Sequence, residues 1–339
     1  MRLQQSAAMA AAFTLSLCLG APALAGTLSS DSLSWDGETR TFKYYEPTGI
    51  GTNRPLVLVL HGGNGDADAA IDNTEGRWND AADANEFWVV YPEGDQSTKN
   101  WNDCRAPTSS AGDGGYDPST ADASTFDDVG FLVELVDWFE TNEDIDLSKV
   151  YVVGASNGGF MTQRLAQEAT GTFAGFGPNI SGIATKDECS APNTSTLQSG
   201  DRKMLFLYGD NDKYVPPAGG CVATPAYGDC RQGEVESAAD SIDQWKTWFG
   251  VTSSGSETAQ ANPVSNDQTR QYWTDHSRSG DVVLRAVRVD NGGHSTPGDT
   301  QLGWVARVLL QLGWKNIDIN HVRTTAQFFD LCTTDPDCY

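Results

Sequence analysis

The hydrophobic residues of this chain are concentrated in short runs that predict β-strands. Most of these runs are nearly continuous rather than alternating, as expected for strands that are covered on both faces of a sheet. The runs are 55–62 (PLVLVLHG), 87–94 (FWVVYPEG), 149–156 (KVYVVGAS), 203–210 (KMLFLYGD) and 281–289 (DVVLRAVRV).

Segments with helical spacing lie between and after these runs. Residues 126–142 begin with acidic side chains and continue with apolar residues on one face, at Val129, Leu132, Val133, Val136 and Phe139. Further helices are predicted at 158–169, 235–249 and 321–331. Alternating strands and helices predict an α/β protein, with a mainly parallel, doubly wound sheet and helices on both faces.

The first residues are typical of a signal peptide. Arg2 precedes an apolar run at 7–19, and the series Ala23-Leu24-Ala25 is typical of a cleavage site, with small residues at its two outer positions. We therefore expect a leader at 1–25 and a single catalytic domain at 26–339, secreted to the periplasm or the medium. A lipoprotein would use Cys18, but Leu17 stands where a small residue is needed. The polar segment 98–125 predicts a long surface loop.

Export to an oxidising compartment makes disulfides the expected state of the cysteines. Six cysteines remain after residue 25. Close spacing favours pairs between Cys221 and Cys230 and between Cys332 and Cys338, which leaves Cys104 with Cys189, although six cysteines allow fifteen pairings. Zinc is the alternative, but the chain has no close C-x-x-C or H-x-x-x-H spacing, so we expect no metal.

The net charge of the 339-residue chain is −24, from 46 acidic and 22 basic residues. Such a surface repels nucleic acid and anionic membranes, so we expect neither as a partner. A neutral or polymeric substrate is compatible with this charge. We expect a monomer.

The sequence GASNG predicts a nucleophilic serine. Gly154 and Gly158 flank Ser156 at the G-x-S-x-G spacing, with a strand pattern before and a helix pattern after. Small residues are required at both flanks because the turn brings the backbone close to its neighbours while the serine adopts a strained conformation. The alternative is an ordinary glycine-rich loop.

A serine hydroxyl needs a base, and the chain has four histidines. His61 follows a buried strand, where it is expected to shape the oxyanion loop. His276 is expected to be a solvated turn residue, and His321 a helix-surface or capping residue. His294 lies in a glycine-rich loop after the last strand, in the chain order Ser, Asp, His, which favours it as the base.

The remaining groups are an acid and two oxyanion donors. Asp210 and Asp212 follow the strand KMLFLYG at 203–209, and either could orient the histidine. The same D-N-D sequence could begin a calcium loop, but position twelve would be Cys221 instead of glutamate. The amide of Asn157 and one from Gly62 or Gly63, with Gly63 preferred, are the expected oxyanion donors.

Six motifs together resemble those of the secreted polyhydroxybutyrate depolymerase and feruloyl esterase family of α/β-hydrolases, also described as carbohydrate esterase family one. They are LHGG, DDVGFLVELVDWF, VYVVGASNGGFMTQRLA, GDNDKYVPP, NGGHSTPG and NIDINHVRTTAQFF, between about residues 40 and 330. The resemblance implies a serine esterase that uses no cofactor.

The family pattern also refines three positions. Its G-T-x-D-x-x-V-P turn places the acid at Asp212 and Asp210 at the threonine position, and its GGHTWPG loop matches His294. Thr296 stands where the family has tryptophan, which implies the loss of an aromatic wall beside the base. Trp101 matches a W-N segment near the active site, so it either stacks on substrate or packs in a loop beside a disulfide.

These expectations define an ester hydrolase that acts through an acyl-enzyme. The resemblance implies polyhydroxybutyrate or a related polyester, or its oligomers, as substrate. The alternative is a feruloyl or acetyl ester on plant polysaccharide. A binding protein that kept the fold and lost the reaction is the hypothesis from outside catalysis.

Overall fold

The computed structural model describes residues 25–95, 99–105, 126–185, 189–223, 230–332 and 338. Almost all of the expected leader and most of the expected surface loop at 98–125 lie outside these residues. Among the described residues, no helix has the length and apolar character that a membrane span requires.

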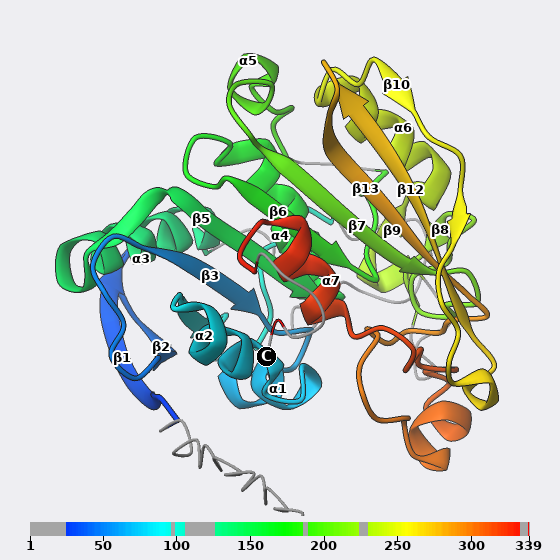
Figure 1. The fold of residues 1–339 in the computed structure, drawn as a ribbon, viewed down its shortest axis with the longest axis horizontal. Coiled ribbons are helices and arrows are strands. Elements are labelled where there is room, and N and C mark those ends of the chain that lie inside the picture. The colour runs from blue at the N-terminus through cyan, green and yellow to red at the C-terminus, as the bar shows by residue number, and fades with distance from the viewer. Residues whose placement is uncertain are drawn as a thin grey trace, which may run out of the picture.

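A mixed sheet of eleven strands forms the centre of the described chain (Figure 1). Its strand order is β1-β2-β4-β3-β5-β6-β7-β13-β12-β10, and β11 also pairs with β12. The section from β4 to β13 is parallel, whereas the pairs at both edges are antiparallel. The strands are β1 (Thr27–Trp35), β2 (Glu38–Glu46), β3 (Arg54–Leu60), β4 (Trp88–Pro92), β5 (Ile145–Ala155), β6 (Gly175–Asn179), β7 (Lys203–Gly209), β10 (Ser253–Ser254), β11 (Thr258–Ala259), β12 (Arg270–Arg278) and β13 (Asp281–Asp290).

Helices cover both faces of the sheet, as Figure 1 shows. The helices are α1 (Ala67–Asn73), α2 (Arg77–Asn85), α3 (Asp128–Glu143), α4 (Asn157–Glu168), α5 (Thr194–Leu197), α6 (Ala238–Trp248) and α7 (His321–Phe328), with short turns η1 (Cys230–Gln232) and η2 (Ser265–Asp267) and a π-helix η3 (Val305–Leu309). A separate two-stranded ribbon pairs β8 (Gly220–Cys221) with β9 (Glu234–Val235).

The apolar runs of the central strands are buried on both sides because alternate side chains point to opposite faces. In β3, Leu56 and Leu58 pack in the cluster that includes α3, α4 and α6. Val57 and Val59 pack in the cluster that includes α1, α2 and α7. The five predicted strands and four predicted helices are therefore confirmed as β3, β4, β5, β7, β13 and α3, α4, α6, α7.

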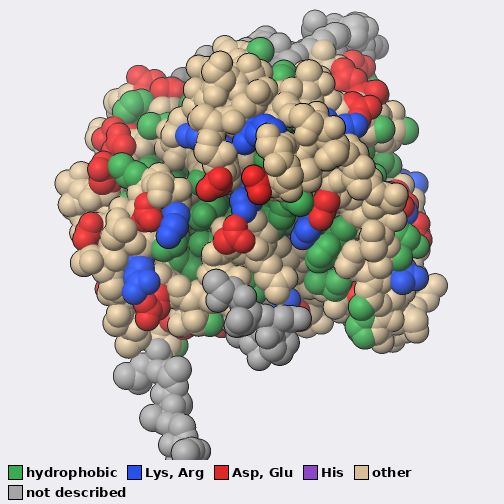
Figure 2. Space-filling model, turned by 45° about the horizontal axis from the view of Figure 1, so that its top comes forward, with side chains coloured by type: hydrophobic (Ala, Val, Ile, Leu, Met, Phe, Trp, Pro, Cys, Tyr) green, Lys and Arg blue, Asp and Glu red, His purple; other side chains and the backbone are tan. Residues whose placement is uncertain are grey.

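Charged side chains remain largely on the surface. Figure 2 shows acidic and basic side chains interspersed over one face, with hydrophobic side chains between them. Three acidic side chains share one cation at Arg288, which pairs with Glu257, Asp210 and Asp290.

The parallel strands bring four loops to one edge of the sheet. β3, β5, β7 and β13 each run to this edge, since their pairings within the sheet are parallel. The segments that follow these strands begin at His61, Ser156, Asp210 and Asn291. Ligands of open α/β sheets bind outside the carboxyl ends of the strands. A ligand-binding site is therefore expected at this edge.

Candidate active site

Ser156 occupies the turn between β5 and α4 in a strained conformation. Its φ is 56° and its ψ is −122°, a backbone conformation that residues other than glycine rarely adopt. A Cβ on Gly154 would lie 2.3 Å from the carbonyl oxygen of Gly158, and a Cβ on Gly158 would lie 2.5 Å from that of Leu60. The close approach explains why both flanking positions are glycine.

The structure brings Ser156, His294 and Asp212 into one hydrogen-bonded chain. Nε2 of His294 lies 3.0 Å from Oγ of Ser156, and Nδ1 lies 2.8 Å from Oδ2 of Asp212. The other carboxylate oxygen of Asp212 accepts the backbone N–H groups of Tyr214 and Val215, at 2.8 and 3.0 Å. The buried acid is thus fixed by its own loop and orients the imidazole, in the geometry of a nucleophile, a base and an orienting group.

Asp210, the other acid offered by the sequence, binds Arg288 and Asn291 instead of His294. Its carboxylate pairs with Arg288 at 2.7 Å and accepts the N–H of Asn291 at 2.6 Å. It therefore ties the loop after β7 to the loop after β13. Of the two acids, only Asp212 is hydrogen-bonded to the histidine.

His61 shapes the loop after β3, as predicted. Its Nε2 accepts the N–H of Gly94 at 2.9 Å, so the ring proton is on Nδ1, which donates to the carbonyl of Gly62 at 2.8 Å. Burial lowers the pKa of His61 and favours this neutral form.

His276 and His321 were expected on the surface, and this expectation was wrong. His276 lies within β12 and is buried, with Nδ1 2.8 Å from the hydroxyl of Ser254. His321 begins α7, but Asn320 caps the helix, and the His321 ring is buried against the carbonyl of Pro297 at 2.8 Å. Both rings are covered because tertiary packing encloses segments that look polar in sequence.

A cavity of about 550 Å³ opens at the serine. Gly62, Gly63 and Asn157 line it together with Ser156 and His294. A Cβ on Gly63 would lie 3.7 Å from Cβ of Asn157, so the two expected oxyanion donors are neighbours. The remaining lining combines apolar with polar groups, among them Ile180, Val215, Val222, Leu302, Leu312, Asp72, Asn73, Glu75, Thr300 and Lys315.

Trp101 does not line this cavity. Its side chain is 2% exposed, its ring centroid lies 4.9 Å from that of His61, and Nε1 donates to the carbonyl of His61 at 3.0 Å. The substrate-stacking hypothesis for Trp101 is therefore wrong, because the ring packs against His61 and is covered. The alternative, a packed loop residue next to a disulfide-bonded cysteine, describes its position.

Tyr214 is a site residue that the sequence reasoning missed. Its ring stacks on the imidazole of His294, with centroids 4.8 Å apart and planes 8° apart, and its hydroxyl donates to the carbonyl of Leu310 at 2.6 Å. Tyr214 thus supplies the aromatic ring whose loss was inferred from Thr296. Its position two residues after the acid, in GDNDKYVPP, was the signal that could have identified it.

The three predicted disulfide pairs are present. They join Cys104 to Cys189, Cys221 to Cys230 and Cys332 to Cys338. The first connects the segment beside the cavity to the chain after β6, and the other two close short loops.

Comparison with known proteins gives consistent matches. A family model described as "Esterase PHB depolymerase" matches residues 40–206, which include Ser156 but neither Asp212 nor His294. A protein of Nocardia uniformis subsp. tsuyamanensis named "Putative esterase NocK" is 30% identical over 272 residues, which are 78% of this chain and 72% of that protein.

Depolymerases are among the other relatives. The poly(3-hydroxybutyrate) depolymerase of Ralstonia pickettii is 28% identical, over 81% of this chain and 55% of that protein. The chain therefore spans little more than half the length of this relative. Among solved structures, an acetyl xylan esterase from Aspergillus awamori matches with a TM-score of 0.57 at 17% identity, over 90% of this chain and 100% of that one. This match shows the α/β-hydrolase fold.

Proposed function

The chain belongs to the esterase PHB depolymerase family of α/β-hydrolases, and on this premise we propose that it is a secreted serine esterase that hydrolyses a water-insoluble polyester. The single observation that carries the catalytic part is the chain of contacts from Ser156 through His294 to Asp212, at 3.0 and 2.8 Å. The predicted leader and the three disulfides support export to an oxidising compartment.

The proposed reaction uses each of these groups in turn. Nε2 of His294 takes the hydroxyl proton of Ser156 as Oγ attacks the ester carbonyl, while Asp212 stabilises the resulting imidazolium. The backbone N–H groups of Asn157 and Gly63 bind the oxyanion of the tetrahedral intermediate. His294 then gives its proton to the leaving alcohol, and a water that it deprotonates releases the acid from the acyl-enzyme.

The preference for an insoluble polyester rests on an exposed apolar ridge, which consists of Trp304, Val305, Val308, Leu309 and Leu310. Each of these side chains is between 50% and 60% exposed. Adjacent apolar side chains of this size are uncommon on the surface of a soluble protein unless they bind something. The charged side chain within the segment, Arg307, lies with its guanidinium 4.0 Å from the ring centroid of Trp314.

The ridge continues into the cavity. Leu302 and Leu312, which stand before and after the ridge in the sequence, both line the cavity that contains Ser156. A solid that is apolar and uncharged could rest on the ridge while one of its ester groups reaches the serine. A surface of anionic lipid is disfavoured as the occupant because the chain carries a net charge of −24.

An ester-substituted polysaccharide is the second candidate substrate. The observation that favours it is the polar part of the cavity lining, where Asp72, Asn73 and Thr300 offer hydrogen bonds to sugar hydroxyls. The two candidates are separated by incubating the protein with polyhydroxybutyrate film and with feruloylated arabinoxylan. Release of hydroxyacid alone supports the polyester, and release of ferulate alone overturns it.

The catalytic proposal is tested with the variant Ser156→Ala. We expect hydrolysis of p-nitrophenyl butyrate to fall by several orders of magnitude, because the variant lacks the hydroxyl that attacks the ester in the proposed mechanism. Ser148→Ala is the matched control, since Ser148 is an exposed serine toward the opposite end of the same strand, β5. Unchanged turnover in Ser156→Ala would refute the mechanism and favour a binding protein.

A further inference from the structure

The side chain of Asn157 ties the start of α4 to residues 101–103. Its Oδ1 accepts the N–H of Trp101 at 2.7 Å, and its Nδ2 donates to the carbonyl of Trp101 at 3.0 Å and to the carboxylate of Asp103 at 2.6 Å. Both polar atoms of this buried side chain are therefore engaged. Whatever fixes residues 101–103 also fixes the backbone of Asn157.

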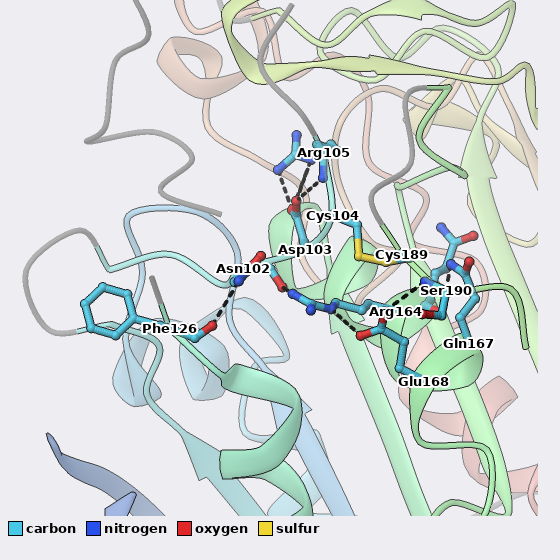
Figure 3. The surroundings of a disulfide bond; sticks show 11 residues. Asn102, Asp103, Cys104, Arg105, Phe126, Arg164, Gln167, Glu168, Cys189 and Ser190 are labelled. Carbon is cyan, nitrogen blue, oxygen red and sulfur yellow. Dashed lines mark hydrogen bonds and ion pairs between the residues drawn. A yellow bond between two sulfur atoms is a disulfide. The ribbon is translucent and has the colours of Figure 1, made fainter. Parts of the chain in front are cut away.

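Asp103 is a buried carboxylate that forms an ion pair with Arg105. The guanidinium of Arg105 meets it at 2.6 Å through Nη2 and at 3.0 Å through Nε, as Figure 3 shows. Both side chains are almost completely covered. A charged acceptor makes a stronger hydrogen bond than a neutral one, so Asp103 holds the amide of Asn157 more firmly than a neutral residue would.

The segment 101–105 is fastened along one face of α4. Asn157 contacts Asp103, the ring of Phe160 lies 4.0 Å below the guanidinium of Arg105, and Arg164 donates to the carbonyl of Asn102 at 2.7 Å. The helix positions are separated by three and four residues, the spacing that places side chains on one face.

A disulfide adds a covalent connection to the same segment. Cys104, between Asp103 and Arg105, is joined to Cys189 (Figure 3). Glu168 at the end of α4 accepts both the guanidinium of Arg164 and the N–H of Ser190. The disulfide and these contacts thus connect the segment, the helix and the chain around residue 190.

We propose that Asp103 is a positioning residue, which acts through the side chain of Asn157 to aim the backbone N–H of Asn157 at the oxyanion. The inference rests on the proposed ester hydrolysis at Ser156. Oxyanion donors are effective because they are already in place when the charge develops. A misplacement of about 1 Å can cost roughly a hundredfold in rate, so a side chain that does not touch the substrate can still control the reaction.

The first test is the variant Asp103→Asn, which keeps the size of the side chain and removes the charge. We expect kcat for p-nitrophenyl butyrate to fall about tenfold to a hundredfold, with KM unchanged. The reason is that a displaced N–H of Asn157 weakens only the binding of the oxyanion, which forms in the transition state. The affinity for butaneboronic acid, which forms a tetrahedral adduct with the serine, should fall by the same factor as kcat/KM. An unchanged kcat in the folded variant would overturn the proposal.

A double-mutant cycle tests whether Asp103 acts through Asn157. Asn157→Ala keeps the backbone N–H and removes the side-chain bonds. If Asp103 works only through that side chain, the double variant should be no slower than the slower single variant. Losses in kcat that multiply would show two independent effects and contradict the proposed connection.

The disulfide gives a second route if Asp103→Asn does not fold. The paired change Cys104→Ser with Cys189→Ser should lower kcat and the boronic acid affinity together. The control pair, Cys332→Ser with Cys338→Ser, removes a disulfide that closes a short loop after α7, and should lower only the melting temperature. Equal kcat in both pairs would reject the positioning role. The failure of that role leaves the proposed function standing as long as Ser156→Ala is inactive.

Discussion

The imidazole of His294 is held from two directions. Asp212 accepts from Nδ1 at 2.8 Å, and the ring of Tyr214 lies parallel to the imidazole at 4.8 Å between centroids. A rotation of the imidazole about its bond to Cβ would break the hydrogen bond and the stack together. The imidazole is therefore presented to Ser156 in one orientation, although its own loop is rich in glycine.

Two substitutions of Tyr214 should distinguish the contribution of its ring to kcat from that of its hydroxyl. In Tyr214→Ala the loss of an aromatic contact worth about 1 kcal/mol should lower kcat for a soluble ester about fivefold. Tyr214→Phe keeps the ring and removes only the bond to the carbonyl of Leu310, so its kcat should equal that of the wild type. Steady-state kinetics with p-nitrophenyl butyrate measure both. Equal losses in the two variants would assign the effect to the hydroxyl instead.

At the scale of elements, the site is built from the ends of four strands and completed by a segment that belongs to none of them. The π-helix η3 carries most of the apolar ridge. Tyr214 links the ridge to His294, because its hydroxyl donates to the carbonyl of Leu310 and its ring stacks on the imidazole. The ridge therefore has a fixed place beside the cavity.

Changes on the ridge should separate adsorption from catalysis. The double variant Trp304→Ser, Leu309→Ser removes two exposed apolar side chains that do not line the cavity. A loss of about 2 kcal/mol in binding corresponds to roughly thirtyfold weaker adsorption to polyhydroxybutyrate film. Turnover of p-nitrophenyl butyrate should not change.

Leu147→Ser is the matched control for the ridge, because Leu147 is also exposed but lies in β5 far along the strand from Ser156. Adsorption is measured as depletion of the protein from solution over the film. If Leu147→Ser and the ridge variant adsorb equally, the ridge is not the contact surface.

The elements that could be predicted are those whose own hydrophobic pattern indicates that they are buried. The run of β3 from Leu56 to Leu60 is short and rich in branched residues, which favours a strand covered on both faces over a helix. β6 was not predicted because Gly175–Asn179 reads GFGPN, and proline within a run argues against a central strand. Only its neighbours β5 and β7 establish it as one.

The same distinction applies within the site. Ser156 and His294 were predicted because each must follow a strand in a fixed chain order. That order left Asp210 and Asp212 open, and the turn pattern of the family placed the acid at Asp212. The roles of Tyr214 and Asp103 depend on contacts between segments far apart in sequence. The position of Tyr214 two residues after the acid was a local signal for its role, whereas no local pattern marks Asp103. The sequence left two roles open for Trp101 for the same reason, since its cover comes from the loop at His61.

For the whole molecule, buried histidines make stability depend on pH. Burial lowers the pKa values of His61, His276 and His321, so the native state favours the neutral rings. The unfolded chain binds protons to these rings below a pKa of about 6.5. Acidification therefore favours unfolding even before most carboxylates are protonated.

His321 should make the largest measurable contribution of this kind. Burial, together with the charge of Lys315, lowers its pKa to about 4, against the opposing effects of the Pro297 carbonyl, Glu75 and Asp299. Its contribution to stability is complete above the unfolded pKa and is lost as the pH falls toward the folded one. The difference of about 2.5 units corresponds to roughly 3 kcal/mol in the free energy of unfolding.

The variant His321→Asn tests this contribution, since asparagine can still donate to the carbonyl of Pro297 and does not titrate. Urea unfolding followed by tryptophan fluorescence at pH 7, 6, 5 and 4 gives the free energy of unfolding of both proteins. The wild type should lose about 3 kcal/mol more than the variant between pH 6.5 and 4. Glu75, whose pKa is lowered to about 2, acts in a separate window below pH 4.5 and should affect both proteins equally. Parallel pH profiles above pH 4 would show that folding does not lower the pKa of His321.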